Sequence, residues 1–392
     1  MTQTGRMWSF MLQAKKIPVS ELENFKGIVA EDVVSQSRAL ILPRGSNLSW
    51  LSSSAIQSLS TRLTLEGVEY VSVYLDDVDL SVEPLESANE PKLPVKQINN
   101  TLVHQTIRQI GDLYNRIASG EVAHDMYEPL FTTGRILAQE VISSEVITLS
   151  LAKVKEKDEY TFVHSLNVAL LSGFLARKLY GNDKSLIEDV VIGGLLHDVG
   201  KAKIPLEILN KPGPLTDEEY AIMKEHPVLG LEILKEAAIN DETILSVTLY
   251  HHERMDGKGY PRQLRGGFIP FVARIAAVAD VFDAVTTSRV YRTAESLYFA
   301  VSLIIKETNK HFDPKVAREL VSALGLYPPG TVVELSDDST AVVISSNLGD
   351  LLRPVVLVLY DAEGILITQS RPIDLKETPN LYIKRVVGNY SK

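Results

Sequence analysis

The sequence predicts a mainly α multidomain protein, in which a helical central domain lies between a small N-terminal α/β domain and a small C-terminal β domain. The chain has 392 residues, more than one compact domain usually holds. Apolar residues recur at helical spacing through the middle of the chain, whereas β-branched runs bounded by turn residues occupy both ends. A hydrophobic content of 45% and a charged content of 23% are typical of a folded protein and exclude wholesale disorder.

Residues 1–90 are expected to form the N-terminal α/β domain. Short β-rich runs at 27–30, 39–42 and 68–74 predict strands, and the apolar spacing within 50–65 predicts a helix between them. Nothing in this segment has a catalytic pattern, so we expect a regulatory or oligomerisation role. The following stretch, 76–94, is acidic and contains three prolines, which is typical of a linker.

Residues 91–155 are predicted to form a helical linker. One apolar stripe runs from Val103 to Ile117 and a second from Leu130 to Ile142, both at helical spacing. Such helices either pack on the next domain or pair across a homodimer, and the pattern alone does not choose between the two.

Residues 156–326 are predicted to form the helical central domain and 327–392 the C-terminal β domain. After Pro328-Pro329-Gly330 the periodicity changes from helical to extended. We expect strands at 331–335, 341–345, 354–360, 365–369 and 382–387, forming a small barrel or sandwich.

Composition restricts the partners and the compartment. With 40 Lys and Arg against 50 Asp and Glu the net charge is −10, which disfavours non-specific binding to long nucleic acids or anionic lipid. The absence of cysteine excludes disulfides, thiolate zinc sites and thiol nucleophiles. No apolar stretch approaches the roughly 20 residues of a membrane span, and we expect a cytoplasmic protein.

Imidazole and carboxylate groups interrupt the apolar helices of the central domain. His197-Asp198 ends the apolar run Val190–Leu196, and His251-His252 ends another apolar helix. One such histidine is most often a hydrogen-bonded core residue, but the clustering within a span of typical domain size points to metal binding. Imidazole and carboxylate ligands suit iron, manganese, zinc or cobalt, and seven such ligands are more than one metal ion usually takes from a protein. The candidates are His164, His197, Asp198, His226, His251, His252 and Asp280.

Two metal ions sharing Asp198 would fit this number of ligands. Asp198 is the natural bridge because its neighbour, His197, is itself a candidate ligand. Paired ions of this kind hold a hydroxide nucleophile and neutralise phosphoryl oxygens, so the residues point to hydrolysis of a phosphodiester. The segment 253–261 adds a loop rich in glycine and proline with Tyr260 at its tip. This loop is either a tight connection or an aromatic platform for a base.

These motifs resemble those of the HD-GYP phosphodiesterases, a subset of the helical HD-domain metal hydrolases that typically hydrolyse cyclic di-GMP. The resemblance covers about 150–325, and its central motif is His197-Asp198-Val199-Gly200-Lys201. The other matching segments are 211–216, 223–227, 251–261, 274–284 and 312–314. The resemblance implies an all-helical HD-GYP bundle that binds a cyclic dinucleotide.

The resemblance also implies roles for individual residues. One metal would be held by His164, His197, Asp198 and Asp280, and the second by Asp198, His226, His251 and His252. Lys201 would contact the scissile phosphate and, with Asp198, act in catalysis. Tyr260, Arg289 and Arg292 would contact the dinucleotide. Asp283, which we group with these pocket residues, would orient ligands from behind the metals.

Some family members hold a third metal through a glutamate one helical turn before the first histidine, where this chain has Tyr160. The sequence therefore predicts two divalent ions, iron or manganese by family likeness, and linear pGpG as the main product, with further cleavage to GMP possible. Ser288 and Val290 stand where Asp and Pro are common, and we expect them to tune the pocket.

Three other functions would each require different features in the sequence. A cyclic-dinucleotide sensor with little turnover would be indicated by a lost ligand, and no ligand of the two-metal set is missing. A phosphodiesterase for cyclic GMP-AMP is compatible with a stacked aromatic residue, which accepts either purine. A nucleotide triphosphohydrolase would not be expected to contain the loop around Tyr260.

Overall fold

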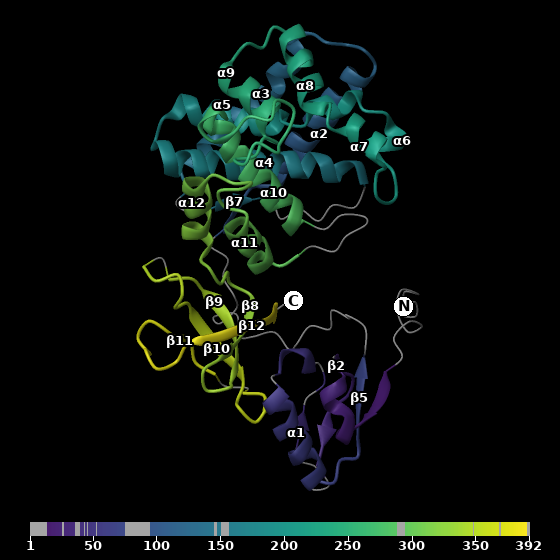
Figure 1. Ribbon diagram of the computed structural model, residues 1–392, viewed down its shortest axis with the longest axis vertical. Coiled ribbons are helices and arrows are strands. Elements are labelled where there is room, and N and C mark those ends of the chain that lie inside the picture. Colours follow the sequence, from purple (N-terminus) through teal and green to yellow (C-terminus); the bar gives the residue numbers. More distant parts are fainter. Residues whose placement is uncertain are drawn as a thin grey trace. The chain divides into compact units, whose positions relative to one another are not determined.

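Figure 1 shows the computed structural model of the chain. It describes residues 14–25, 27–35, 40–42, 44, 46–51, 53–74, 95–144, 147–149, 157–287, 295–347, 349–367 and 370–389. These residues form two compact units, one of 94–323 and one that combines 1–93 with 324–392. The sequence-based division had four parts. In the structure, the helical linker belongs with the central domain, and the two ends of the chain belong together.

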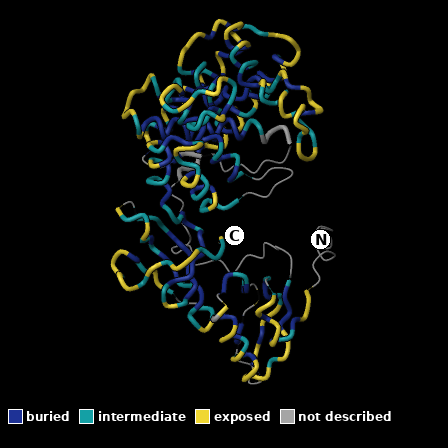
Figure 2. The backbone as a smooth tube through the Cα atoms, in the orientation of Figure 1, coloured by how far each residue is buried: buried dark blue, intermediate teal, exposed yellow. Residues whose placement is uncertain are grey.

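The helical unit is built around two helices, α4 (Lys157–Tyr180) and α5 (Lys184–Leu196). The second half of α5, Val190–Leu196, consists only of apolar residues and glycine, as a helix segment enclosed by others must, and all of it is buried (Figure 2). α4 and α5 approach closely at Gly194, where an added Cβ would lie 2.5 Å from the Ala169 Cα. This contact brings the end of α5 beside the middle of α4.

The other helices of this unit surround that pair. α3 and α9 pack on α5, α2 and α10 pack on α4, and α11 packs on α10. The α-helices are α2 (Asn100–Ala118), α3 (Glu128–Ile142), α6 (Leu206–Leu209), α7 (Asp217–Met223), α8 (His226–Glu236), α9 (Glu242–Tyr250), α10 (Phe271–Thr286), α11 (Leu297–Lys306) and α12 (Pro314–Leu324). The 3-10 turns are η4 (His124–Tyr127), η5 (Val199–Lys203) and η6 (Gly266–Phe268). The prediction of a mainly helical domain is confirmed.

The predicted helical linker also contains a strand pair that the sequence did not indicate. β6 (Val95–Gln97) pairs in parallel with β7 (Ile147–Leu149), so the chain before α2 and the chain after α3 run side by side. Three-residue strands are too short to produce a readable period in the sequence.

The second unit contains four of the predicted C-terminal strands in one antiparallel sheet of five, in the order β11-β10-β9-β8-β12, and β11 is a strand that the sequence did not indicate. The strands are β8 (Thr331–Leu335), β9 (Thr340–Ser345), β10 (Val355–Tyr360), β11 (Ile373–Asp374) and β12 (Ile383–Asn389). The described residues of 327–392 thus form one open sheet, and not the barrel or the two stacked sheets that the sequence suggested. The strand expected at 365–369 is wrong over its described part, where Leu366 forms only an isolated bridge to Tyr360.

The N-terminal residues supply a layer on one face of this sheet. They form a three-stranded sheet, β1-β5-β2, a strand pair β3–β4, and the helix α1. Their bounds are β1 (Lys15–Pro18), η2 (Val19–Asn24), β2 (Ile28–Val29), β3 (Val33–Val34), β4 (Leu40–Leu42), η3 (Leu48–Trp50), α1 (Ser53–Leu65) and β5 (Tyr70–Tyr74). Trp50, Leu59 and Val71 share one hydrophobic core with Val332, Leu357 and Tyr360.

The opposite face of the five-stranded sheet has a second, smaller core that includes Val333, Val343 and Val356. Burial on both faces explains why β8, β9 and β10 read as nearly continuous apolar runs instead of alternating with polar residues. No helix among the described residues is long and apolar enough to cross a membrane.

Candidate metal centre

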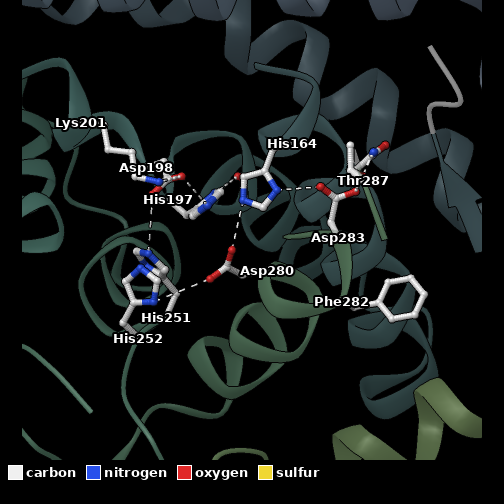
Figure 3. A network of polar contacts seen from close by, with 12 residues as sticks. His164, His197, Asp198, Lys201, His251, His252, Asp280, Phe282, Asp283 and Thr287 are labelled. Carbon is white, nitrogen blue, oxygen red and sulfur yellow. Dashed lines mark hydrogen bonds and ion pairs between the residues drawn. The ribbon is translucent and has the colours of Figure 1, made fainter. Parts of the chain in front are cut away.

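The seven candidate ligands converge at the centre of the helical unit, as Figure 3 shows for most of them. His164 lies in the middle of α4, and His197 caps the end of α5 directly before Asp198. His226 begins α8, His251 and His252 follow α9, and Asp280 lies on α10. Six of these seven residues are buried, at most 8% exposed.

Their ligating atoms fall into two clusters, in each of which the atoms lie within 4.8 Å of one another. One consists of Asp198, His226, His251 and His252, and the other of His164, His197 and Asp280. Asp198 faces both. Its Oδ2 lies 3.2 Å from His197 Nε2, and its Oδ1 lies 3.3 Å from His226 Nε2. The carboxylate therefore stands between the clusters, as a bridging ligand would.

Three imidazoles are oriented by the backbone. Nδ1 of His197 is 2.7 Å from the Gly194 carbonyl oxygen, Nδ1 of His226 is 2.8 Å from that of Met223, and Nδ1 of His251 is 2.9 Å from that of Thr248. A carbonyl oxygen only accepts, so each Nδ1 carries the proton. In the neutral ring Nε2 then has a free lone pair directed at the centre.

These lone pairs face other acceptors. Nε2 of His226 and Nε2 of His251 are 3.2 Å apart. Among the described residues no group makes a hydrogen bond to His197 Nε2 or to Asp198 Oδ1, although both atoms are buried. Lone pairs that converge without protons between them repel, and a cation relieves that repulsion. The donor set therefore fits divalent metal ions.

The protonation states of the candidate ligands also favour metal binding. Burial lowers the pKa of His226 to about 3 and that of His252 to about 4, so both rings are neutral near pH 7. Burial also lowers the pKa of His251. Burial alone would raise the pKa of Asp198, but the nearby His197 and Lys201 outweigh it and keep that pKa well below its ordinary value. Neutral imidazoles beside an ionised carboxylate are the forms that coordinate metals.

His164 differs because carboxylates lie at both of its nitrogens. Nδ1 is 2.7 Å from Asp283 Oδ2, and Nε2 is 3.1 Å from Asp280 Oδ1 (Figure 3). Burial lowers the pKa of His164, but the hydrogen bonds to Asp280 and Asp283 outweigh burial and raise it to about 9. The metal-free ring is therefore protonated at both nitrogens near pH 7, and a metal ion that binds Nε2 would displace the proton there.

A cavity of about 810 Å³ opens beside the two clusters. Lys201 lies on its wall and donates a hydrogen bond of 2.5 Å from Nζ to Asp198 Oδ2. Tyr260 lines the cavity as well, and its ring stacks on His252 with centroids 4.6 Å apart. Volumes of this order accommodate organic ligands, so the cavity places a cation and an aromatic face next to the candidate metal ligands.

The loop that carries Tyr260 is held by Glu253, a residue to which the sequence analysis gave no role. Its buried carboxylate accepts hydrogen bonds from the backbone N–H groups of Arg262, at 2.6 Å, and Leu264, at 2.9 Å. Two charge-assisted bonds to a buried acceptor fix the loop strongly. Glu253 therefore determines where Tyr260 is presented.

Asp283 is placed differently from a pocket residue. It is 4% exposed, is not part of the cavity wall, and accepts hydrogen bonds from Asn167 and Thr287 in addition to His164. This placement favours its expected orienting role behind His164 over its expected grouping with the pocket residues, and both roles stay predictions. Asn167 could have been noticed in the sequence, because it interrupts an apolar helix face three residues after His164.

Three of the predicted positions are not tested by the geometry. Arg289 and Arg292 lie in the segment 288–294, outside the described residues. Tyr160 lies on α4 four residues before His164, but its side chain is also outside the described part. The roles assigned to these residues stay predictions.

Two protein-family models match the chain. An HD domain matches residues 147–316, and a KOW domain associated with HD domains matches 332–391. The first covers the five helices that carry or precede the candidate ligands, α4, α5, α8, α9 and α10, and the second covers nearly all of the five-stranded sheet.

Curated relatives come from several bacteria. A cyclic di-GMP phosphodiesterase of Pseudomonas aeruginosa is 40% identical over 58% of this chain and 54% of its own length. The cyclic di-GMP phosphodiesterase response regulator RpfG of Xanthomonas campestris is 38% identical over 48% of this chain and 50% of its own. A 3'3'-cGAMP-specific phosphodiesterase of Vibrio cholerae is 34% identical over 48% of this chain and 43% of its own. The chain thus spans about half the length of these relatives.

Proposed function

The chain belongs to the HD-GYP family of HD-domain proteins, and from this premise we propose that it is a metal-dependent phosphodiesterase that hydrolyses cyclic di-GMP. The observation that carries the proposal is the convergence of two His/Asp clusters on the shared carboxylate of Asp198, beside a cavity lined by Lys201.

We assign one metal to His164, His197, Asp198 and Asp280, and a second to Asp198, His226, His251 and His252. The support is the division of the ligating atoms into two clusters and the position of Asp198 between them. Two such ions would activate a water as the nucleophile and neutralise charge on the phosphoryl oxygens. Imidazole and carboxylate ligands suit iron or manganese.

The residues of the chain have separate tasks. Lys201 supplies a positive charge where the scissile phosphate gains negative charge, and its bond to Asp198 holds the ammonium group beside the clusters. Tyr260, stacked on His252, offers its other face to a guanine base. Arg289 and Arg292 are assigned to the dinucleotide on the family resemblance alone. With Tyr160 in place of the third metal's glutamate, the proposed product is linear pGpG.

The test begins with anaerobic purification and elemental analysis, followed by incubation with cyclic di-GMP and chromatographic identification of the product. The variant carries His197→Ala and Asp198→Ala. The matched control is His124→Ala, because His124 is half exposed and does not line the cavity. We expect two metals per chain, pGpG from the wild type and the control, and no product from the double variant.

Three outcomes would change the proposal. Tight nucleotide binding with intact metal but no turnover, under both iron and manganese loading, would indicate a cyclic-dinucleotide sensor. Three metals per chain in an active preparation would contradict the dinuclear site. Faster hydrolysis of cyclic GMP-AMP than of cyclic di-GMP would reassign the substrate, an alternative favoured by the similarity to the Vibrio cholerae enzyme specific for 3'3'-cGAMP.

A further inference from the structure

A tyrosine outside the HD-domain match contributes to the wall of the cavity. Tyr114 lies on α2, whereas the HD match begins at residue 147. Tyr114 is 8% exposed and lines the same cavity as Asp198, Lys201 and His252. No group among the described residues makes a hydrogen bond to its buried hydroxyl. A buried hydroxyl without a partner is costly, so its retention beside a reactive site calls for an explanation.

The ring of Tyr114 is held firmly. Phe162 on α4 packs edge-on against it, with centroids 5.4 Å apart and an interplanar angle of 69°. One turn earlier on α2, Gly111 approaches Phe162 so closely that an added Cβ would lie 3.1 Å from its ring. α2 also packs on η5, the turn that carries Lys201. The ring of Tyr114 is therefore fixed on a helix that packs against the turn carrying Lys201.

The hydroxyl is a hydrogen-bond donor under all ordinary conditions. Burial and the negative charge of Asp198 hold the pKa of Tyr114 well above its usual value, so the phenol stays protonated. It cannot act as a general base. What it lacks is an acceptor, and an oxygen of a ligand in the cavity is the group that would supply one.

We propose that the Tyr114 hydroxyl donates a hydrogen bond to a phosphodiester oxygen of the bound cyclic dinucleotide, together with Lys201. This inference rests on the proposed function, because it takes the ligand of the cavity to be a phosphodiester. It adds a substrate contact from α2, so the HD domain as matched does not contain the whole site.

The test is Tyr114→Phe, which removes only the oxygen and keeps the ring against Phe162. Tyr127 provides a matched control, because its hydroxyl is also buried and unpartnered among the described residues but does not line the cavity. Melting temperature, metal content, kcat and KM for cyclic di-GMP are measured for the wild type, Tyr114→Phe and Tyr127→Phe.

We expect Tyr114→Phe to melt at the same temperature as the wild type or higher, with unchanged metal content, because an unpaired polar group has been removed. Its kcat/KM should fall about 100-fold, the typical effect of losing one donor to developing negative charge. Tyr127→Phe should match the wild type in kcat/KM and metal content. Wild-type kinetics in Tyr114→Phe would overturn the proposal, as would a loss of activity that follows a loss of metal or of fold.

A binding measurement separates this inference from the proposed function. If the wild type binds cyclic di-GMP without hydrolysing it, the phosphodiesterase proposal fails while the contact can still be measured. Binding about tenfold weaker in Tyr114→Phe than in Tyr127→Phe would then support the contact, and equal binding in the two variants would overturn it.

Discussion

Replacement of Asp283 by asparagine tests whether the metal centre depends on a residue that does not contact the metals. Asp283 accepts three hydrogen bonds, from His164 Nδ1 at 2.7 Å, Asn167 Nδ2 at 2.8 Å and Thr287 Oγ1 at 3.0 Å. Asparagine has the same shape, but one of its two acceptor oxygens becomes an NH2 donor.

Neither orientation of the new amide satisfies its neighbours as they are now oriented. If the NH2 group faces His164, two donors meet, or the ring moves its proton to Nε2 and loses the lone pair needed for a metal. If the NH2 group faces Asn167, two amide donors meet unless the Asn167 amide turns over to present its oxygen. The loss of one carboxylate also lowers the pKa of His164 from about 9, which weakens the competition between proton and metal and so offsets part of the loss in affinity. Changes to such a supporting carboxylate typically cost about 10- to 100-fold in metal affinity, or about 1.4–2.8 kcal/mol.

The assay is metal content after dialysis against graded chelator, followed by cyclic di-GMP hydrolysis with metal in excess. Thr287→Val is the matched control, because it removes one donor to Asp283 and leaves the bond to His164. It should cost at most about 1 kcal/mol of stability and leave metal affinity unchanged. If Asp283→Asn retained metal as tightly as Thr287→Val, the positioning role of Asp283 would be refuted.

Three further predictions follow from the described contacts. Metal binding near neutral pH should release about one proton per chain, because the metal-free His164 has a pKa of about 9 and its ring must lose a proton to coordinate. Metal affinity should therefore rise with pH up to about that pKa. Calorimetry in buffers of different ionisation enthalpy measures the proton release, and a result of no release would contradict this prediction. Gly259→Ala should raise KM about tenfold or more in assays with metal in excess, because the added Cβ would lie 2.5 Å from three backbone atoms of 252–254 and displace the loop that carries Tyr260. Gly267→Ala, whose added Cβ meets nothing within 4 Å, should behave as wild type in the same kinetic assay. Trp50→Ala should destabilise the unit formed by the two ends of the chain by about 3–5 kcal/mol in urea titrations while elemental analysis shows unchanged metal, and an unaltered unfolding curve would argue against the shared core.

The sequence by itself indicated the helical class of the central domain and the identity of the candidate ligands. Both are local properties. Helical spacing can be recognised within a short stretch of sequence. A histidine or aspartate at the end of an apolar run is conspicuous because burying such a polar side chain without a partner is costly. Short motifs such as His197-Asp198 and the loop before Pro261 also carried the family resemblance, because their residues are neighbours along the chain.

Only the tertiary structure decided how those residues divide between two clusters, which nitrogen of each histidine faces the centre, and that Asp283 stands behind His164. It also joined the N-terminal segment to the C-terminal sheet around Trp50 and brought Tyr114 from the predicted linker to the cavity. In the sequence, Tyr114 is one more member of an apolar stripe. The physical reason is that these relations are contacts between residues many positions apart, and a pattern in consecutive residues reports which face of a helix is buried but not which partner buries it.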